Sequence, residues 1–172
     1  MLNVAESPQH TTSVASLLRG ELDALVSYAI HLSGDPNAAT EEVVAGIHHA
    51  LRFPPAQWTD GSRAILYRAV TRACKQHERF PAQPAGLGKL FKRAQAPYFV
   101  DVDTTGAGRV NTVKRAIATM PFERRAALLL RDHAGLNYRE LSTVLECSPQ
   151  MAARTVATAR REFGAIFKEI AL

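Results

Sequence analysis

The sequence predicts an all-α protein: two small helical bundles joined by a Pro/Gly linker, the second bundle ending in a helix-turn-helix. Three observations support this prediction. Apolar residues recur at three- and four-residue steps in several stretches, which is the spacing of one helical face. A segment with three prolines and four glycines separates these stretches into two groups. Near the end of the chain, a short turn joins two stretches that both carry helix-start signals.

Three helices are predicted in the first group, over residues 13–32, 36–53 and 62–79. Ser33-Gly34-Asp35-Pro36 ends the first and begins the second, because glycine suits a helix end, aspartate a cap and proline the first helical position. Trp58 is expected to fill the junction between helices. The predicted inward positions are Leu17, Leu18, Leu22, Leu25, Ala29 and Leu32, then Val43, Ile47, Ala50 and Leu51, then Ile65, Leu66, Ala69, Val70 and Ala73.

The domain boundaries follow from the change in composition. Residues 1–80 form the first predicted domain, residues 81–109 the linker and residues 110–172 the second domain. Within the linker, residues 89–93 favour one helical turn and residues 98–102 an extended piece. The second domain is expected to begin with a helix over residues 110–119, followed by one that starts after Pro121 and reaches His133.

Residues 137–163 form the predicted helix-turn-helix. Asn137 and Glu140 have the spacing of a capping box, and Ser148-Pro149 opens the second helix. The inward stripe of that helix is Ala152, Val156, Ala159 and Phe163, and the opposite face carries Gln150, Arg154, Thr158 and Arg161. Amide and guanidinium groups on one side of a small helix suit a DNA major groove. An ordinary helical hairpin with a solvated basic face is the alternative.

Charge is distributed unevenly along the chain. The net charge is +5, and residues 109–172 carry 11 Lys/Arg against 6 Asp/Glu, whereas residues 1–80 carry 7 against 8. The excess positive charge therefore lies in the helix-turn-helix segment, which favours contact with phosphates. No apolar run is long enough to span a membrane, no secretion signal is evident, and the two cysteines are far apart, so a cytoplasmic chain is expected.

Several motifs together resemble the small sigma factors of the sigma-70 family, the extracytoplasmic-function (ECF) group. The resemblance runs from Leu17 to Phe167 and is most specific near the end of the chain. The matching motifs are Met120-Pro121, Arg124-Arg125-Ala126, Leu128-Leu129-Leu130, Gly135-Leu136-Asn137-Tyr138-Arg139-Glu140-Leu141, Cys147-Ser148 and Ala159-Arg160, with weaker matches at Ser33-Gly34-Asp35-Pro36, Arg63-Ala64 and Leu66-Tyr67-Arg68.

The resemblance implies a dissociable subunit of bacterial RNA polymerase that directs promoter-specific initiation. Its partners would be core RNA polymerase, promoter DNA and an anti-sigma factor. The first domain would dock on the polymerase clamp through Glu41, Glu42, Val44, Ile47 and His48, and would contact the −10 element through Arg63, Arg68 and Arg72. The second domain would contact the −35 element through Gln150, Arg154, Thr158 and Arg161.

The chain departs from the family pattern at defined positions. Val44 replaces a glutamine of the clamp segment, and so loses its hydrogen bond. Ile65 replaces an aromatic residue of the melting segment, and Arg72 replaces an asparagine. Glu146 replaces the turn glycine, at a cost of about 1 kcal/mol if the backbone there is left-handed. We therefore expect weaker DNA binding than is usual in the family, or an unusual target sequence.

These departures leave two functions open, an initiation factor and a sigma-factor mimic that sequesters an anti-sigma factor with weak or no promoter activity. The basic second domain favours the first. A helix-turn-helix regulator that never docks on polymerase would leave the first domain unexplained. Cys74 and His77 have ligand-like spacing, but a zinc site needs three or four converging ligands, so no metal is expected. No catalytic or cofactor motif is present, and an enzyme with a small-molecule substrate is not expected.

Overall fold

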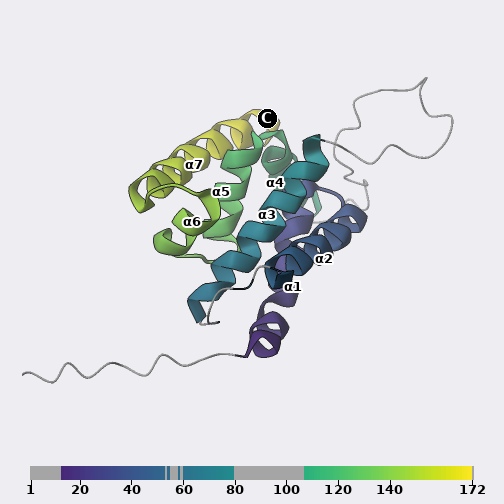
Figure 1. The fold of residues 1–172 in the computed structure, drawn as a ribbon. Helices are drawn as coiled ribbons and strands as arrows, with labels where there is room; N and C mark the ends of the chain where they lie inside the picture. Colours follow the sequence, from purple (N-terminus) through teal and green to yellow (C-terminus); the bar gives the residue numbers. More distant parts are fainter. Residues whose placement is uncertain (1–12, 53, 55–57, 59, 80–106, 172) are drawn as a thin grey trace, which may run out of the picture.

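The computed structural model describes residues 13–52, 54, 58, 60–79 and 107–171. Within these ranges the chain forms seven α-helices and one short 3-10 helix, without a strand, which confirms the all-α prediction. The first group contains α1 (Val14–Ser33), α2 (Pro36–Arg52), η1 (Asp60–Ser62) and α3 (Arg63–Arg79). The second contains α4 (Ala107–Thr119), α5 (Phe122–Asp132), α6 (Tyr138–Leu145) and α7 (Pro149–Ala171) (Figure 1).

The junction between α1 and α2 is built as the sequence predicts. Gly34 ends α1 with a left-handed backbone (φ 80°), and its N–H donates to the carbonyl of Ile30 at 2.9 Å. Asp35 Oδ1 accepts the N–H of Asn37 at 2.9 Å, so this side chain caps α2 ahead of Pro36. The two helices consequently reverse direction over very few residues and pack side by side.

The start of the second group differs from the prediction. Helix α4 begins at Ala107 and not at Val110, so it includes the last three residues assigned to the linker. The rest of the predicted linker, with its proposed turn at residues 89–93 and extended piece at 98–102, lies outside the described residues.

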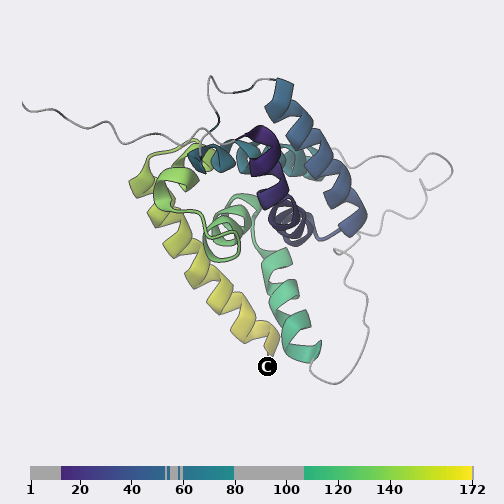
Figure 2. The same cartoon turned by 90° about the horizontal axis from the view of Figure 1, so that it is seen from below.

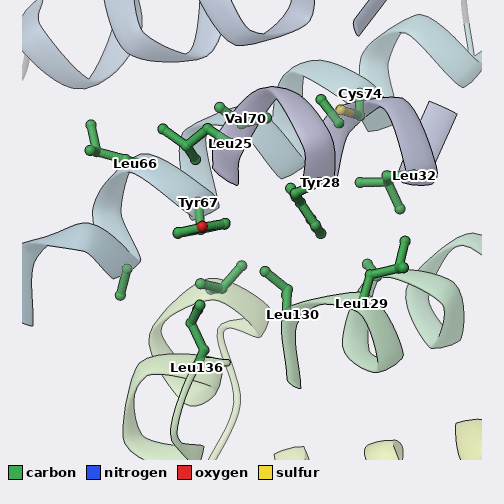
Figure 3. Close-up of a cluster of buried hydrophobic side chains, with 14 of the residues drawn as sticks. Leu25, Tyr28, Leu32, Leu66, Tyr67, Val70, Cys74, Leu129, Leu130 and Leu136 are labelled. Carbon is green, nitrogen blue, oxygen red and sulfur yellow. The ribbon is translucent and has the colours of Figure 1, made fainter. Parts of the chain in front are cut away.

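One apolar core joins the two groups of helices. Buried side chains of α1 and α3 continue without a break into buried side chains of α5, α6 and α7. Figure 2 shows α1 and α3 lying directly against α5 and α6. In Figure 3, Tyr28 and Tyr67 from the first group face Leu130 and Leu136 from the second, and all four side chains are fully buried. The two groups are therefore docked on each other in the free chain.

The two tyrosines satisfy their hydroxyl groups at this junction. Their rings meet edge to face, with centroids 5.5 Å apart. Thr71 Oγ1 donates its hydrogen to the Tyr67 carbonyl at 2.7 Å. Thr71 Oγ1 therefore acts as the acceptor in its second hydrogen bond, which the Tyr28 hydroxyl donates at 2.8 Å. Tyr67 in turn donates to Glu21 Oε2 at 3.3 Å. Large aromatic rings can therefore be buried between the groups without an unpaired hydroxyl.

Two predicted inward leucines are exposed instead. Leu22 of α1 is 44% exposed and Leu51 of α2 is 41% exposed. At 100° per residue, each lies at the edge of its helix's apolar stripe. Trp58 is partly buried against the core, in agreement with its predicted place at the helix junction.

Candidate nucleic-acid interface

The helix-turn-helix begins with the predicted capping box. Asn137 Oδ1 accepts the N–H groups of Arg139 and Glu140, both at 3.0 Å. Glu140 Oε2 accepts the Asn137 N–H at 2.8 Å, which completes the reciprocal pair. Leu136, just ahead of the cap, is fully buried, and its carbonyl accepts from Arg131 Nη1 at 2.8 Å. Helix α6 is therefore fixed at its start by both polar and apolar contacts.

The turn between α6 and α7 has a left-handed residue. Glu146 has φ 53° and ψ 44°, and it is the only non-glycine residue with positive φ in the described part of the chain. Its N–H donates to the Ser142 carbonyl and ends α6. Ser148 Oγ then accepts the Met151 N–H at 3.2 Å and caps α7. The predicted cap at Ser148 is confirmed, and the left-handed backbone that was only a condition in the sequence analysis is found at Glu146.

Helix α7 has one buried side and one exposed side. Ala152, Val156 and Ala159 are buried against α5 and α6. At 100° per residue, the opposite side carries Gln150, Arg154, Thr158 and Arg161 within an arc of about 80°. Gln150, Arg154 and Arg161 are exposed and Thr158 is half-buried. We call these four residues the α7 stripe.

The side chains of the α7 stripe are available to a ligand. Arg154 has no hydrogen-bond or ion-pair partner among the residues that the structure describes. Arg161 Nη2 makes one long bond of 3.3 Å, to Thr158 Oγ1. By contrast, the neighbouring Arg160 pairs with Asp132 of α5 and is directed back toward the protein. Cationic groups without an internal partner suit the phosphates and base edges of DNA.

The arginines of α3 have a different environment. Arg63 makes a bidentate pair with Glu140, at 2.6 Å from Nε and 2.9 Å from Nη2. Arg72 pairs with Glu146 of the turn. Arg68 is half-buried and has no ion-pair partner in the described part of the chain. Two of the three predicted −10 contacts are thus occupied by the helix-turn-helix of the same chain.

The α3 arginines also do not share one side of the helix. Arg63 and Arg72 are nine residues apart, which places them about 180° from each other. They flank the face that carries Tyr67 and Thr71 and packs against the second group. The hydrogen bonds from Arg63 hold the pKa of Glu140 below its ordinary value. The sequence did not predict that Glu140 and Glu146 pair with arginines of α3. The glutamate in place of the family's turn glycine was the one feature of the sequence that could have indicated it.

The predicted polymerase-binding residues on α2 divide into two sets. Glu41, Val44 and His48 are exposed and Ile47 is half-buried, all on the outer side of the helix. Glu42 is 4% exposed and lies toward α3, so it is not available on the outer surface as predicted. Its position in the helix places it about 100° from Glu41, on the inward side. Cys74 Sγ donates to Glu42 Oε2 at 3.1 Å, and burial raises the pKa of both groups.

An apolar groove between α1 and α2 adds residues that sequence reasoning missed. It has a volume of about 480 Å³ and includes Leu22, Val26 and Ile30 of α1 with Val43, Val44 and Ile47 of α2. Val44 is 63% exposed at its rim. The groove is open to the surface, and most of the side chains that line it are apolar.

The described residues around Cys74 do not form a metal site. His77 Nδ1 lies 3.9 Å from Glu42 Oε1, close to Cys74, but no three His, Cys, Asp or Glu side chains in the described residues are arranged to hold a metal ion. None of the described helices combines the length and the apolar character that a bilayer crossing requires.

Helices α6 and α7, with the turn between them, form a helix-turn-helix, a motif that many DNA-binding proteins use. Residues 111–163 match the family model described as sigma-70, region 4. This range contains most of α4, all of α5 and α6, and α7 as far as Phe163. The match supports a sigma-70 family member, and such a domain is a DNA-binding part of the transcription machinery and not an enzyme. No curated protein matches the chain.

Proposed function

We propose that this chain is an ECF-type sigma factor, which binds core RNA polymerase and directs it to specific promoters from within the cytoplasm. The observation that carries the proposal is the α7 stripe, whose Arg154 is exposed and has no partner among the described residues, inside a segment that matches sigma-70 region 4. In this proposal α7 lies in the major groove of the −35 element. Gln150 and Arg154 contact base edges near its N-terminal end, and Thr158 and Arg161 contact the backbone.

The α1/α2 groove is the proposed docking surface for the polymerase clamp. Val44 stands where the family has glutamine, so this chain offers apolar area in place of a hydrogen bond. Glu41 and His48 lie beside it on the outer side of α2, and Ile47 lines the groove. Docking through an apolar patch with a polar rim is typical of protein interfaces.

Run-off transcription with purified core RNA polymerase tests this proposal. Transcripts with a defined start that depend on the added chain are expected. Val44→Asp, which places a charge in the apolar groove, should reduce the yield at least tenfold by weakening core binding. Ala45→Asp is the matched control, because Ala45 is also exposed on α2 but does not line the groove. Equal loss in both variants would contradict docking at this surface.

The alternative is a sigma-factor mimic that sequesters an anti-sigma factor. The pairing of Arg63 and Arg72 with the chain's own carboxylates favours this alternative, since these groups are then withheld from DNA. The exposed arginines of the α7 stripe argue against it, because neither has an acidic partner among the described residues and a mimic has no need for such cationic groups. Tight binding of an anti-sigma factor without any core binding would support the mimic and reject the initiation factor.

A further inference from the structure

We infer that the contact between α3 and the helix-turn-helix is an intramolecular latch, which holds Arg63 and Arg72 until DNA or polymerase separates the two helix groups. The inference rests on the proposed function only in naming DNA as the competitor for these arginines. The latch itself follows from the ion pairs that join α3 to the helix-turn-helix. Its acidic half is Glu140 and Glu146, and its basic half is Arg63 and Arg72.

The Arg63–Glu140 pair is the stronger half of the latch. Both guanidinium bonds reach the same carboxylate, and the Glu140 side chain is only 11% exposed. Charge-assisted bidentate bonds of this kind fix orientation as well as adding energy. Because Glu140 also completes the capping box, its carboxylate joins the start of α6 to the start of α3.

The Arg72–Glu146 pair is notable for the backbone conformation of its acidic residue. Glu146 adopts a left-handed backbone, which glycine adopts without strain. A non-glycine residue held in such a strained backbone conformation points to a role for its side chain. Here the strained residue places a carboxylate on Arg72, on the opposite flank of α3 from Arg63. A glycine at this position would relax the turn and remove the contact.

Two further pairs bridge the same boundary. Lys75 Nζ lies 2.8 Å from Glu123 Oε1, and Arg125 Nη2 lies 3.0 Å from Glu78 Oε1. Both pairs join α3 of the first group to α5 of the second. The ion pairs fix the orientation in which the two helix groups meet. Each exposed pair contributes little to the free energy of that contact by itself. Opening therefore becomes easier, but not spontaneous, when the latch carboxylates are removed.

The test compares two double variants that change net charge equally. Glu140→Gln with Glu146→Gly removes both latch carboxylates, while glutamine retains the capping box. Asp132→Asn with Glu162→Gln removes two carboxylates that pair within the second group, with Arg160 and Arg124. The second double variant controls for the general gain in DNA binding that follows from added positive charge.

Opening is measured without DNA by the reaction of a thiol introduced with Ala126→Cys, in a Cys147→Ser background. Ala126 is 1% exposed and lies where α5 meets Thr71 and Arg72 of α3. Cys74 of α3 is buried beside Glu42 of α2, and its labelling rate reports unfolding of the first group. In the latch variant the introduced thiol should react about three- to tenfold faster, while the labelling rate of Cys74 stays unchanged. In the control double variant the introduced thiol should react at the same rate as in the parent chain without the double substitution.

The outcomes separate the latch from the proposed function. Equal labelling rates in the two double variants, or acceleration at Cys74 as well, would overturn the latch. Affinity for a duplex with a single-stranded −10-type segment should rise severalfold more in the latch variant than in the control. Faster labelling without DNA binding by any variant, even at low salt, would support the latch and reject the proposed function.

Discussion

Arg154 is the residue on which DNA recognition depends most in this account. It is exposed, it has no partner among the described residues, and it lies near the N-terminal end of α7, which enters the groove in helix-turn-helix proteins. Arg154→Ala should weaken binding to −35-type duplex DNA by about 1–3 kcal/mol, measured by fluorescence anisotropy at fixed salt.

Lys168→Ala is the control for this prediction. Lys168 is exposed on the same side of α7, but 14 residues further on, or about 21 Å along the helix. Its loss should change the affinity much less. Equal effects of the two substitutions would mean that α7 binds DNA only through general charge attraction.

Asn137 supports the same site through its cap. Asn137→Ala removes two hydrogen bonds to the first turn of α6 and should lower the free energy of unfolding by about 0.5–2 kcal/mol in urea titrations. Asn137→Asp retains an acceptor oxygen and should lose much less. An unchanged midpoint for Asn137→Ala would show that the cap is not needed for the stability of α6.

Hydrogen bonds between residues close together in the sequence could be predicted from local patterns. The capping box at Asn137 and the Ser148 cap follow from spacing and residue type alone, whereas a left-handed Glu146 was suggested only by the family's glycine at that turn. The pairing of Glu140 with Arg63 does not, because 77 residues separate the two. For the same reason, the burial of Glu42 depends on where α3 lies and was not predicted from α2 alone.

At the scale of helices, Gly46 controls how closely α2 approaches α3. A Cβ added there would lie 2.8 Å from Val70 Cα, a backbone atom that cannot move away freely. Gly46→Ala should therefore destabilise the protein by about 1–3 kcal/mol through overpacking.

Gly164→Ala in α7 is the matched comparison for Gly46. An added Cβ at Gly164 meets no atom within 4 Å, so this substitution should stabilise the helix by up to about 1 kcal/mol. Thermal unfolding of the two variants gives the comparison. A shift of both melting temperatures in the same direction would contradict the close approach of α2 and α3.

Apolar periodicity predicted most helix bounds to within three residues, and the largest difference is α7, which runs to Ala171, eight residues beyond the predicted helix-turn-helix. Periodicity also placed Leu22 and Leu51 inward, where the structure exposes them. The pattern shows which side of a helix is apolar, but it does not show how much of that side a neighbouring helix covers. The α1/α2 groove arises from this uncovered part, and so it was not predicted.

For the whole molecule, the contact between the two helix groups should weaken at mildly acidic pH. Burial lowers the pKa of His133 below its ordinary value of 6.5, and nearby His31 lowers it further. His133 Nε2 bonds to Ser27 Oγ at 2.9 Å, and the two histidine rings lie 4.8 Å apart. The adjacent Asp132 pairs with Arg160.

The sign of this pH effect follows from proton binding. Because the folded pKa of His133 is lower, the unfolded chain binds more protons below about pH 6.5, and stability falls as the pH decreases through that value. Urea unfolding at about pH 7.5 and 5.5 should show a smaller loss for His133→Gln than for the wild type. The same loss in both proteins would show that His133 does not titrate in this contact.

Docking of the two helix groups was beyond sequence reasoning. Each group has its own apolar periodicity, so two separate bundles were the natural expectation. The shared core depends on Tyr28, Tyr67, Leu130 and Leu136 meeting across the chain, and nothing in their local patterns specifies that partner. The family resemblance likewise concerned each group by itself.

Selection of bound DNA from a pool of randomised duplexes, with the chain assembled on core RNA polymerase, tests the central claim most directly. An enriched −35-type motif is expected, and Arg154→Ala should remove the preference at one or two adjacent positions while leaving the rest of the motif intact. Enrichment of the same complete motif by Arg154→Ala, or no motif with the wild-type chain, would contradict the placement of α7 in the major groove.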